Sequence, residues 1–380
     1  MSVPSGEARR AMGASSKLGV RKTAVLAACL ALVAFISPAW LAGEAWGQLM
    51  PHVVALSAGC EIGAFIGASP PSASEVREFE NLIGQHVRSI MWYQAWDESN
   101  QPSFPTAACE DVRYHDGYDT HTIVHLTWEP WADLNDIANG TYDSYLSSYA
   151  ADCRKWADPI RLRFAHEMIE DDNPHTGNPW YPWQDQPAAY VAAFRHVHDV
   201  FQAAGATNVE FVWCPGNWTS DVAVLQKYYP GPDYVDWLGT GGCNCGEDGE
   251  PGWPYWQWFD DLFYDIYHAF VDHPEVFGDK PVMIAEFSSG EAGPYEQPGE
   301  TKAAWIANAC QRIKSPDYSR IKAFYWFHYR PQADGCDWRI DSSPESLAAF
   351  RTCVSDSYFT SHPLPAAVIY LPIVMRHCCP

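Results

Sequence analysis

Eight short apolar segments alternate with amphipathic stretches along the chain, and this alternation limits the possible folds more than any other feature. The segments span residues 61–66, 88–93, 122–127, 161–165, 208–213, 234–239, 281–285 and 321–327. Near-continuous apolar runs that alternate with helices are typical of a parallel sheet covered by those helices. Eight such units predict a closed (β/α)8 barrel, the TIM barrel of the α/β class.

The amphipathic stretch from Pro187 to Ala204 is the clearest helix in the sequence. Its apolar residues stand at positions 190, 194, 197, 201 and 204 and therefore share one helical face. Pro187 suits the first turn, and Gly205 directly after the run is a typical stop. Further helices are predicted over residues 74–83, 142–155, 256–270, 300–313 and 344–351. Together they supply the outer layer that a barrel requires.

Residues 1–47 have the pattern of a secretory signal peptide. Arg21 and Lys22 precede an uncharged apolar run over residues 23–36, and small residues follow it. The run is shorter than the roughly 20 residues that cross a bilayer, which argues against an uncleaved membrane anchor. A lipoprotein cleavage box at residues 26–29 is another alternative, but few apolar residues separate it from Lys22. We therefore predict a secreted, extracellular protein, with attachment to the cell surface as the alternative.

The remainder of the chain reads as one catalytic domain and a short tail. No linker rich in Pro, Ser or Thr and no repeat divides residues 48–357, so we expect a single (β/α)8 domain there. Residues 358–380 differ, because positions 366–375 are almost wholly apolar. This apolar C-terminal tail is compatible with an edge strand and with a sorting or anchoring segment.

The mature chain is expected to be strongly acidic. The full sequence has a formal charge of −23, and removal of residues 1–47 leaves 19 basic and 45 acidic side chains, a charge of −26. Such a surface repels nucleic acid and anionic membranes, so neither is expected as a partner. A neutral polymer is not repelled by it.

The chain contains twelve cysteines, which is many for a reducing compartment. With export, disulfides are the default interpretation, and eleven cysteines remain after loss of the signal peptide. Cys243 and Cys245 lack a second close Cys or Cys/His pair, so bridges to distant cysteines are favoured over a metal site. The odd count predicts one free or intermolecular thiol, at Cys378 or Cys379.

Two glutamates each follow one of the apolar segments and are the candidate catalytic residues. Glu167 comes after the segment 161–165 and Glu286 after the segment 281–285, and the two are 119 positions apart. In a barrel this separation holds about three β/α units of roughly 35 to 40 residues each, so the two carboxyl groups are expected to face each other across one cleft. A pair about 5 Å apart is what retaining hydrolysis of a glycosidic bond requires.

The neighbours of the two glutamates suit different roles. Arg163 and His166 offer a positive charge and a hydrogen bond beside Glu167, and a partly buried carboxyl suits a general acid. Glu286 would act as the ionised nucleophile, supported by Ser288 and nearby backbone amides. The alternatives are a salt-bridged barrel residue at position 167 and a solvated surface residue at position 286.

Two histidine patterns resemble metal sites but fail on spacing. The helical zinc-protease motif that begins with His166 and Glu167 needs a histidine at position 170, where this chain has Glu170. His196 and His198 are two positions apart inside the predicted helix, so their side chains point in different directions. We therefore expect neither a metal nor an organic cofactor.

Aromatic residues make up 14% of the chain, and many tryptophans lie beside Pro or Gly in loop-like stretches. The long loop over residues 168–186 holds Trp180 and Trp183 and follows the fourth segment, at the barrel end where active sites are built. Flat rings on loops suit stacking against sugars, although most aromatic side chains fill cores. Trp128, next to the third segment, is a further candidate for contact with substrate.

Several short segments, considered together, resemble glycoside hydrolase family 26, a family of β-mannanases with some β-1,3-1,4-glucanases and xylanases. The segments are Arg163-Phe-Ala-His-Glu-Met168, Trp180-Tyr-Pro-Trp183, residues 190–197, 204–208 and 211–215, Tyr228-Tyr-Pro-Gly231, Tyr234-Val-Asp-Trp237 and Lys280-Pro-Val-Met-Ile-Ala-Glu286. The similarity covers roughly residues 55–355. It implies a (β/α)8 barrel that hydrolyses β-linked polysaccharide without a cofactor.

The resemblance also implies roles for individual residues. Glu167 would be the acid/base, Glu286 the nucleophile, and His166 would touch the sugar beside the scissile bond, with Arg163 close by. Trp180 and Trp183 are implied to line the leaving-group side. Trp326, at the end of the eighth segment, is implied to lie beneath the subsite where the sugar distorts.

The chain departs from the family pattern at two places. Cys243 stands where the family usually has a tyrosine that hydrogen-bonds the nucleophile, and an insertion separates Met168 from Trp180. The predicted activity is an endo-glycosidase that cuts internal β-1,4 links of mannan. A β-1,3-1,4-glucanase or xylanase is the alternative within the family, and a catalytically weak carbohydrate-binding surface protein is the alternative from another class.

Overall fold

A computed structural model describes residues 59–360 except 170–178, 246–255, 292–297 and 331–335. The predicted signal peptide and all of the tail after Thr360 lie outside these residues. Among the described residues, no helix combines the length and the apolar character that a membrane crossing needs.

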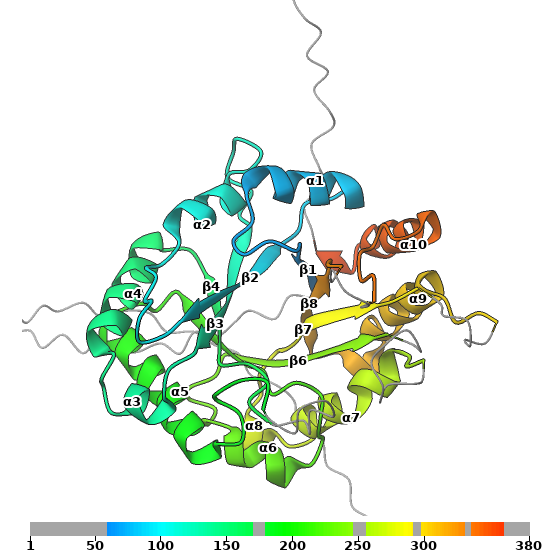
Figure 1. The fold of residues 1–380 in the computed structure, drawn as a ribbon. Coiled ribbons are helices and arrows are strands. Elements are labelled where there is room, and N and C mark those ends of the chain that lie inside the picture. Colours follow the sequence, from blue (N-terminus) through cyan, green and yellow to red (C-terminus); the bar gives the residue numbers. More distant parts are fainter. Residues whose placement is uncertain (1–58, 170–178, 246–255, 292–297, 331–335, 361–380) are drawn as a thin grey trace, which may run out of the picture. The chain divides into compact units, whose positions relative to one another are not determined.

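Eight parallel strands close into a barrel with helices around its outside (Figure 1). The strands are β1 Cys60–Phe65, β2 Ser89–Trp96, β3 Ile123–Pro130, β4 Ile160–Phe164, β5 Val209–Trp213, β6 Trp237–Asn244, β7 Val282–Ser289 and β8 Ile321–Phe327. Neighbours along the chain are neighbours in the sheet, and β1 pairs with both β2 and β8 to close the ring. All eight predicted segments are strands, which confirms the (β/α)8 fold.

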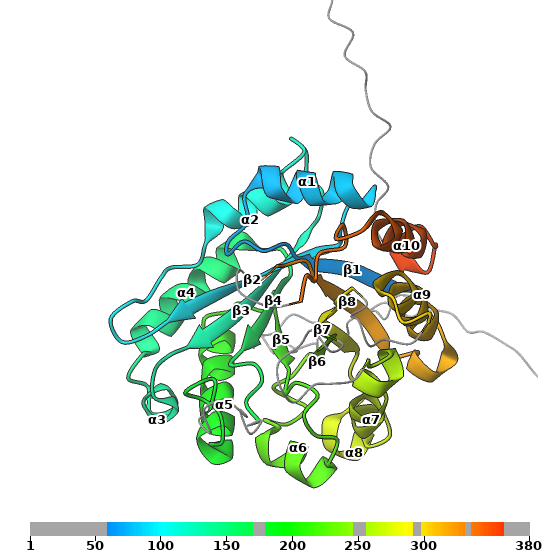
Figure 2. The same cartoon turned by 45° about the vertical axis from the view of Figure 1, so that its right-hand side comes forward.

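The helices cover the outer face of the barrel, as the turned view shows (Figure 2). They are α1 Ala73–Ile83, α2 Thr106–Arg113, α3 Leu134–Ala138, α4 Asp143–Trp156, α5 Pro187–Ala203, α6 Val222–Tyr228, α7 Phe259–Val271, α8 Pro274–Phe277, α9 Lys302–Ile313 and α10 Pro344–Val354. The six predicted helices are α1, α4, α5, α7, α9 and α10. Helices α2, α3, α6 and α8 were not predicted, because they are short and carry little periodic signal.

Local signals explain where the best-predicted helices begin and end. Ser72 and Glu75 form a capping box at the start of α1, and Gly84 closes that helix with a left-handed φ of 80°. Pro187 occupies the first turn of α5, where its missing N–H costs nothing. The bounds of α1 and α5 agree with the sequence prediction to within one residue.

Side chains on each strand alternate between the barrel interior and the layer beneath the helices. The interior cluster includes Met91, Val212, Met283, Ala323 and Tyr325. The outer layer is a much larger apolar cluster that joins the strands to the helices. Every residue at a strand end therefore has a fixed direction, and this direction decides which of the predicted site residues can reach a substrate.

Strand β6 begins and ends later than predicted, because Gly239, Gly241 and Gly242 have low strand propensity and weaken the strand signal in this part of the sequence. A Cβ atom on Gly239 would lie 2.9 Å from Cβ of Cys214, and one on Gly242 would lie 2.5 Å from Nδ2 of Asn217. Close approach of neighbouring segments requires glycine at both positions.

Two disulfides join distant segments, Cys245 to Cys336 and Cys310 to Cys353. The expectation that Cys243 and Cys245 bridge distant cysteines is therefore confirmed for Cys245 and wrong for Cys243. The expectation of a single unpaired thiol is wrong, because Cys109, Cys153, Cys214 and Cys243 form no disulfide within the described residues. The first three are buried and behave as small apolar core residues. Cys378 and Cys379 lie outside the described part of the chain.

The barrel domain extends slightly past its predicted end at residue 357. A two-residue strand β9, Phe359–Thr360, pairs in parallel with β1, and Phe359 is buried against Phe324. The first residues assigned to the tail thus belong to the sheet.

Candidate active site

Glu167 and Glu286 lie at the same end of the barrel, at strands β4 and β7, which are three places apart in the ring. Glu286 is part of β7, and Glu167 follows β4 after Ala165 and His166. Because all eight strands are parallel, their carboxyl ends share one end of the barrel, where active sites of this fold are built. Both glutamates are partly exposed, so both can reach a bound molecule.

The backbone around Glu167 has an unusual conformation. Ala165 and Glu167 have positive φ values of 47° and 52°, which cost non-glycine residues energy and are concentrated at functional sites. The N–H of Glu167 donates to the carbonyl of Cys214 at 2.8 Å, and Gln184 Nε2 donates to the carbonyl of Glu167 at 2.7 Å. These bonds hold the backbone of Glu167 in place and so fix the direction of its Cα–Cβ bond.

Glu286 is held by two donors that reach the same carboxylate oxygen. The Tyr93 hydroxyl donates to Oε1 at 2.6 Å, and Arg163 Nη2 donates to Oε1 in a salt bridge. Arg163 is itself fixed by Thr127 Oγ1, which accepts at 2.7 Å. Burial lowers the pKa of Arg163 and the Glu286 carboxylate raises it, with a net shift upward, so the guanidinium stays charged. Arg163 was expected beside Glu167, but its partner in the structure is the other candidate carboxylate, Glu286.

Glu167 and Glu286 both raise the pKa values of the same two side chains. Burial raises the pKa of the Tyr181 phenol, and the negative charges of Glu167 and Glu286 raise it further. The pKa of the Cys243 thiol is raised by burial and by the same two carboxylates. The two acids therefore share an environment, as the sequence analysis expected of a catalytic pair.

A third carboxylate at this end of the barrel was missed. Glu129 lies on β3, and burial raises its pKa, with the negative charge of Glu286 adding to the shift and a hydrogen bond from Trp131 opposing it. The predicted third segment ended at residue 127. An acid at the carboxyl end of that strand was the signal that could have identified Glu129.

His166 is buried among aromatic rings next to Glu167. Its ring centroid lies 4.9 Å from that of Tyr181 and 5.8 Å from that of Tyr93. Burial and the positive charge of Arg163 lower its pKa well below the ordinary value, so the imidazole is neutral. Its Nδ1 atom has no hydrogen-bond partner within the described residues. A neutral ring with an unoccupied nitrogen suits a hydrogen bond to a sugar hydroxyl.

The two loop tryptophans after β4 have different surroundings. Trp180 is 57% exposed and available for stacking. Trp183 is completely buried, and its Nε1 donates to the carbonyl of His166 at 2.6 Å. The expectation that Trp183 lines the leaving-group side is wrong, because its ring is buried and holds the backbone of His166. Tyr181, which stacks on Trp183 at 4.6 Å, and the half-exposed Trp131 present their rings instead.

The predicted contacts of Trp128 and Trp326 with substrate are also wrong. Trp128 is 0% exposed and packs against Trp96 and Tyr149, under the helices. Trp326 is 1% exposed and packs against Trp305 and Phe350 in the same outer layer. Both point outward from the barrel because alternation along a strand sends neighbouring residues to opposite faces.

Phe327 and Trp338 form an aromatic surface where Trp326 was expected to act. Phe327 faces the interior, stacks on Phe65 with ring centroids 4.7 Å apart, and meets Trp338 edge-on at 5.5 Å. Trp338 lies in the connection after β8, and its carbonyl accepts from Ser288 Oγ at 3.0 Å. A shift of one residue along β8 therefore changes which ring is near the site.

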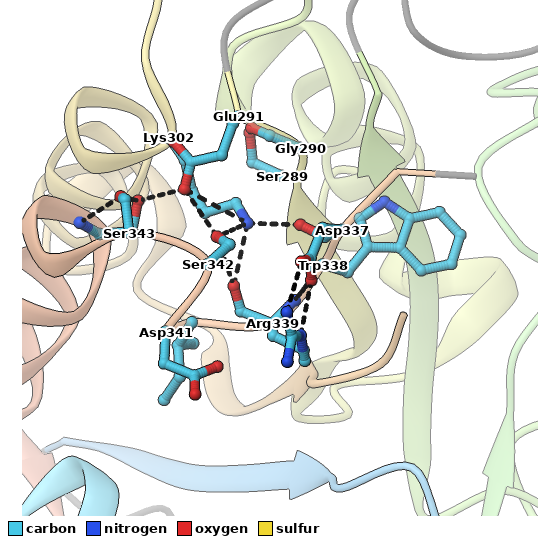
Figure 3. A network of polar contacts seen from close by, with 12 residues as sticks. Ser289, Gly290, Glu291, Lys302, Asp337, Trp338, Arg339, Asp341, Ser342 and Ser343 are labelled. Carbon is cyan, nitrogen blue, oxygen red and sulfur yellow. Dashed lines mark hydrogen bonds and ion pairs between the residues drawn. The ribbon is translucent and has the colours of Figure 1, made fainter. Parts of the chain in front are cut away.

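A buried lysine fixes the connection that carries Trp338 (Figure 3). Lys302 Nζ donates to the carbonyls of Asp337 at 2.5 Å and Arg339 at 2.9 Å and to Ser342 Oγ. Glu291, which follows β7, accepts from Ser342 at 2.6 Å and lies 3.7 Å from the lysine. This Lys302 network, together with the Cys245–Cys336 bridge, attaches the connection after β8 to the ends of β6 and β7.

Cys243 lies beside Glu286 but does not replace the tyrosine of the family pattern. It pairs in register with Ser288, two residues after Glu286. A thiol is a weak donor and cannot substitute for a phenol. The phenol that contacts Glu286 is Tyr93, which comes from β2 and was not singled out in the sequence. No sequence motif marked Tyr93, because its role depends on a partner 193 residues away.

Comparisons with known proteins agree with this architecture. The chain is 35% identical over 311 residues to endoglucanase H of Acetivibrio thermocellus, and 27% identical over 109 residues to a β-1,3-xylanase of a Vibrio species. The aligned region covers 78% of this chain but 31% of endoglucanase H, so the chain spans about a third of that relative. No model of a known protein family matches the chain.

Solved structures with the same fold include family 26 enzymes. They are the catalytic domain of a Bacillus endo-β-1,4-mannanase (TM-score 0.55, 17% identity, 80% of this chain and 87% of that one), a β-mannanase of Bacteroides ovatus (0.57, 14%, 80% and 91%) and a family 26 protein of a Muricauda species (0.59, 16%, 80% and 87%). The predicted resemblance to glycoside hydrolase family 26 is thus confirmed at the level of the barrel fold.

Proposed function

We propose that this protein is a retaining endo-acting glycoside hydrolase that cuts internal bonds of a β-linked polysaccharide. The observation that carries the proposal is the setting of Glu286, whose Oε1 receives the Tyr93 hydroxyl at 2.6 Å and the Arg163 guanidinium. A carboxylate oriented in this way, with a second glutamate on a fixed backbone across the barrel, has the parts that a double displacement needs. The similarity to an endoglucanase supports the same class of reaction.

In the first step Glu286 attacks the anomeric carbon of the sugar. Tyr93 and Arg163 hold Oε1, so the other carboxylate oxygen, Oε2, is the attacking atom. Glu167 donates its proton to the glycosidic oxygen as the bond to the leaving chain breaks. The product of this step is a glycosyl ester on Glu286 and a released chain end.

In the second step water hydrolyses the glycosyl ester. Glu167, now ionised, takes a proton from the water as it attacks the anomeric carbon, and Glu286 leaves as the carboxylate. Two inversions at one carbon give net retention. The neutral imidazole of His166 contributes a hydrogen bond to the sugar, and the exposed rings of Tyr181, Trp131 and Phe327 contribute apolar surface against it.

Two polysaccharides are candidate substrates. The sequence resemblance predicted β-1,4-mannan, and the solved structures with the same fold include mannanases at 14 to 17% identity. The match to endoglucanase H is 35% identical, and this favours a β-glucan, either β-1,4 or mixed-linkage. We place β-glucan first because the identity to endoglucanase H is 35%, against 14 to 17% for the mannanases.

We also propose that the enzyme acts outside the cell. The support is the signal-peptide pattern over residues 1–47 and the two disulfides of the described barrel, which persist in oxidising compartments.

The decisive experiment combines a substrate panel with an anomeric readout. Barley β-glucan, lichenan, carboxymethylcellulose, galactomannan and xylan are each incubated with the protein, and new reducing ends and early product anomers are measured, the latter by proton NMR. We expect internal cleavage with a β-anomer formed first. An initial α-anomer would overturn the retaining mechanism, and binding without new reducing ends on any member would favour a carbohydrate-binding protein.

Glutamate variants test the assigned roles. Glu286→Ala and Glu167→Ala should each lose at least roughly a thousandfold in turnover while the melting temperature stays close to that of the wild type. Azide added to Glu286→Ala should give a glycosyl azide of inverted configuration, because the small anion occupies the space of the lost carboxylate. Glu78→Gln, on the exposed face of α1, is the matched control and should keep full activity.

A further inference from the structure

A second cluster of chemically competent side chains lies far from the two catalytic glutamates. Glu80 on α1, His86 in the connection to β2, and His115 and Asp116 after α2 place one ligand atom each within 4.8 Å of one another. The first three residues are buried and Asp116 is partly exposed. The cluster precedes β2 and β3, so it belongs to the amino end of the strands, opposite the catalytic end.

The protons of His115 can be assigned from its neighbours. Its Nδ1 lies 2.7 Å from the carbonyl oxygen of Val112, which only accepts, so Nδ1 carries a hydrogen. Its Nε2 lies 2.6 Å from Oε2 of Glu80. In a neutral imidazole Nε2 then has no hydrogen, and its lone pair faces the carboxylate oxygen. Two electron-rich atoms 2.6 Å apart, Nε2 of His115 and Oε2 of Glu80, require a cation between them, which is either a proton or a metal ion.

The same carboxylate oxygen serves the second histidine. Oε2 of Glu80 lies 2.6 Å from Nδ1 of His86, so two imidazole nitrogens and one carboxylate oxygen converge on one point. The other polar atoms of Glu80 and His86 have partners of their own. Val87 N–H donates to Oε1 of Glu80 at 2.9 Å. Nε2 of His86 lies 2.8 Å from the Tyr118 hydroxyl and 3.5 Å from Oδ2 of Asp116.

This second layer of contacts is the kind that supports metal ligands. A histidine that binds a metal through one nitrogen typically gives its other N–H to a backbone carbonyl or a carboxylate, and a ligating carboxylate is hydrogen-bonded in turn. His115 has Val112, His86 has Asp116 and Tyr118, and Glu80 has Val87. The atoms that remain for an ion are His115 Nε2, His86 Nδ1 and Glu80 Oε2, which point towards one another.

We propose that Glu80, His86 and His115 bind one divalent zinc ion. Two imidazoles with one carboxylate are a recurrent zinc ligand set, and imidazole nitrogen disfavours calcium and magnesium. The negative charges of Glu80 and Asp116 balance the charge of the ion. At bond lengths of about 2.0 to 2.1 Å the donor atoms of a tetrahedral site stand roughly 3.3 Å apart, so they separate by several tenths of an ångström when the ion enters.

The proposed site links three neighbouring elements of the barrel, the helices α1 and α2 and the connection that leads into β2. Glu80 belongs to α1, His86 to the residues that lead into β2, and His115 to the end of the α2 segment. An ion held by all three adds its binding free energy to the folded state, because the unfolded chain does not assemble the site. Its role is therefore structural, and it is independent of the proposed hydrolase activity.

The test uses the full chain and zinc itself. Protein freed of metal with a chelator is titrated with Zn²⁺ by calorimetry, the bound metal is counted by mass spectrometry after gel filtration, and the melting temperature is recorded at each stage. We expect one zinc per chain and a rise of roughly 3 to 8 °C in melting temperature. Co²⁺ should give the visible d–d absorption of a tetrahedral site, which is a readout on the wild-type chain that does not depend on the folding of a variant.

Variants distinguish zinc binding at this site from nonspecific zinc binding by surface histidines. His86→Gln and His115→Gln should both lose the zinc and the temperature rise, whereas His121→Gln, whose side chain is 67% exposed nearby, should keep both. Wild-type protein that retains no zinc and shows no temperature rise would overturn the proposal and identify the cluster as a proton-bridged histidine–carboxylate network. Equal loss of zinc in His121→Gln would also overturn it. Hydrolase activity enters neither outcome.

Discussion

The hydroxyl of Tyr93 on β2 lies 2.6 Å from Oε1 of Glu286 on β7, across the interior of the barrel. The two residues are 193 positions apart, and the contact supplies a phenol to the proposed nucleophile that the residue at position 243 cannot supply. We expect Tyr93→Phe to lower kcat by roughly 10- to 100-fold, because a hydrogen bond to a charged group contributes about 1.5 to 3 kcal/mol. Steady-state kinetics on the best polysaccharide of the panel measures this effect.

The control for Tyr93 is Tyr190→Phe. Tyr190 is buried on α5, and its hydroxyl has no hydrogen-bond partner within the described residues. Its kcat should stay within about twofold of the wild type. Equal losses in both variants would mean that the effect of Tyr93→Phe is a general response to removing a buried hydroxyl.

Cys243 should be dispensable for turnover if Tyr93 is the donor to Glu286. We expect Cys243→Ala to keep kcat within about threefold of the wild type. Because burial and the two glutamates raise the pKa of the Cys243 thiol, it stays protonated at neutral pH and should resist iodoacetamide until the chain is unfolded. Mass spectrometry of the labelled peptide checks this. Rapid modification of the native protein at pH 7, or a large loss of kcat in Cys243→Ala, would contradict the prediction.

Trp326 and Phe327 are adjacent but should respond to truncation in opposite ways. Trp326→Ala empties a buried position in the outer layer and should cost about 3 to 5 kcal/mol of unfolding free energy. Phe327→Ala removes a partly exposed ring at the catalytic end and should raise KM roughly tenfold, with a smaller loss of stability. Denaturant titration and oligosaccharide kinetics distinguish the two. The reverse pattern would show that the register of β8 is wrong by one residue.

Lys302 should give the protein a specific dependence of stability on pH. Burial lowers its pKa to about 8 from 10.5, and the neighbouring Glu291 and Asp337 only partly oppose this. Between these two pH values the unfolded chain binds more protons at this residue than the folded chain does. The contribution of Lys302 to the free energy of unfolding therefore rises with pH across that window, by up to about 3 kcal/mol.

The variant Lys302→Met separates the pH dependence of stability that is due to Lys302 from that due to thiols and phenols, which titrate in the same pH range. Lys302→Met should lower stability by about 3 kcal/mol near pH 7, because it leaves the carbonyls of Asp337 and Arg339 without their donor and Glu291 without its countercharge, and it should lack the rise with pH. Lys314→Met, which removes a half-exposed partner of Asp356, should keep the wild-type pH dependence. Thermal unfolding from pH 7 to pH 10.5 makes the comparison, and parallel curves for all three proteins would refute the assignment.

Local sequence patterns were enough to predict the barrel and the places of both glutamates along the chain. Strand and helix periodicities are local properties, so eight apolar segments and the run after Pro187 could be read without knowledge of any contact. The same local reasoning placed Glu167 and Glu286 at strand ends, and parallel strands bring such ends together. It also indicated that Cys245 bridges a distant cysteine.

The side chains that surround those glutamates could not be predicted in the same way, because they depend on how the barrel folds. A shift of one residue along a strand reverses the direction of a side chain, which is why Trp128 and Trp326 lie beneath helices while Glu129 and Phe327 face the site. Contacts such as Tyr93 with Glu286, or Glu80 with His115, join residues that have no fixed spacing in sequence. Closure of the barrel creates them, because it brings segments together that no local propensity relates.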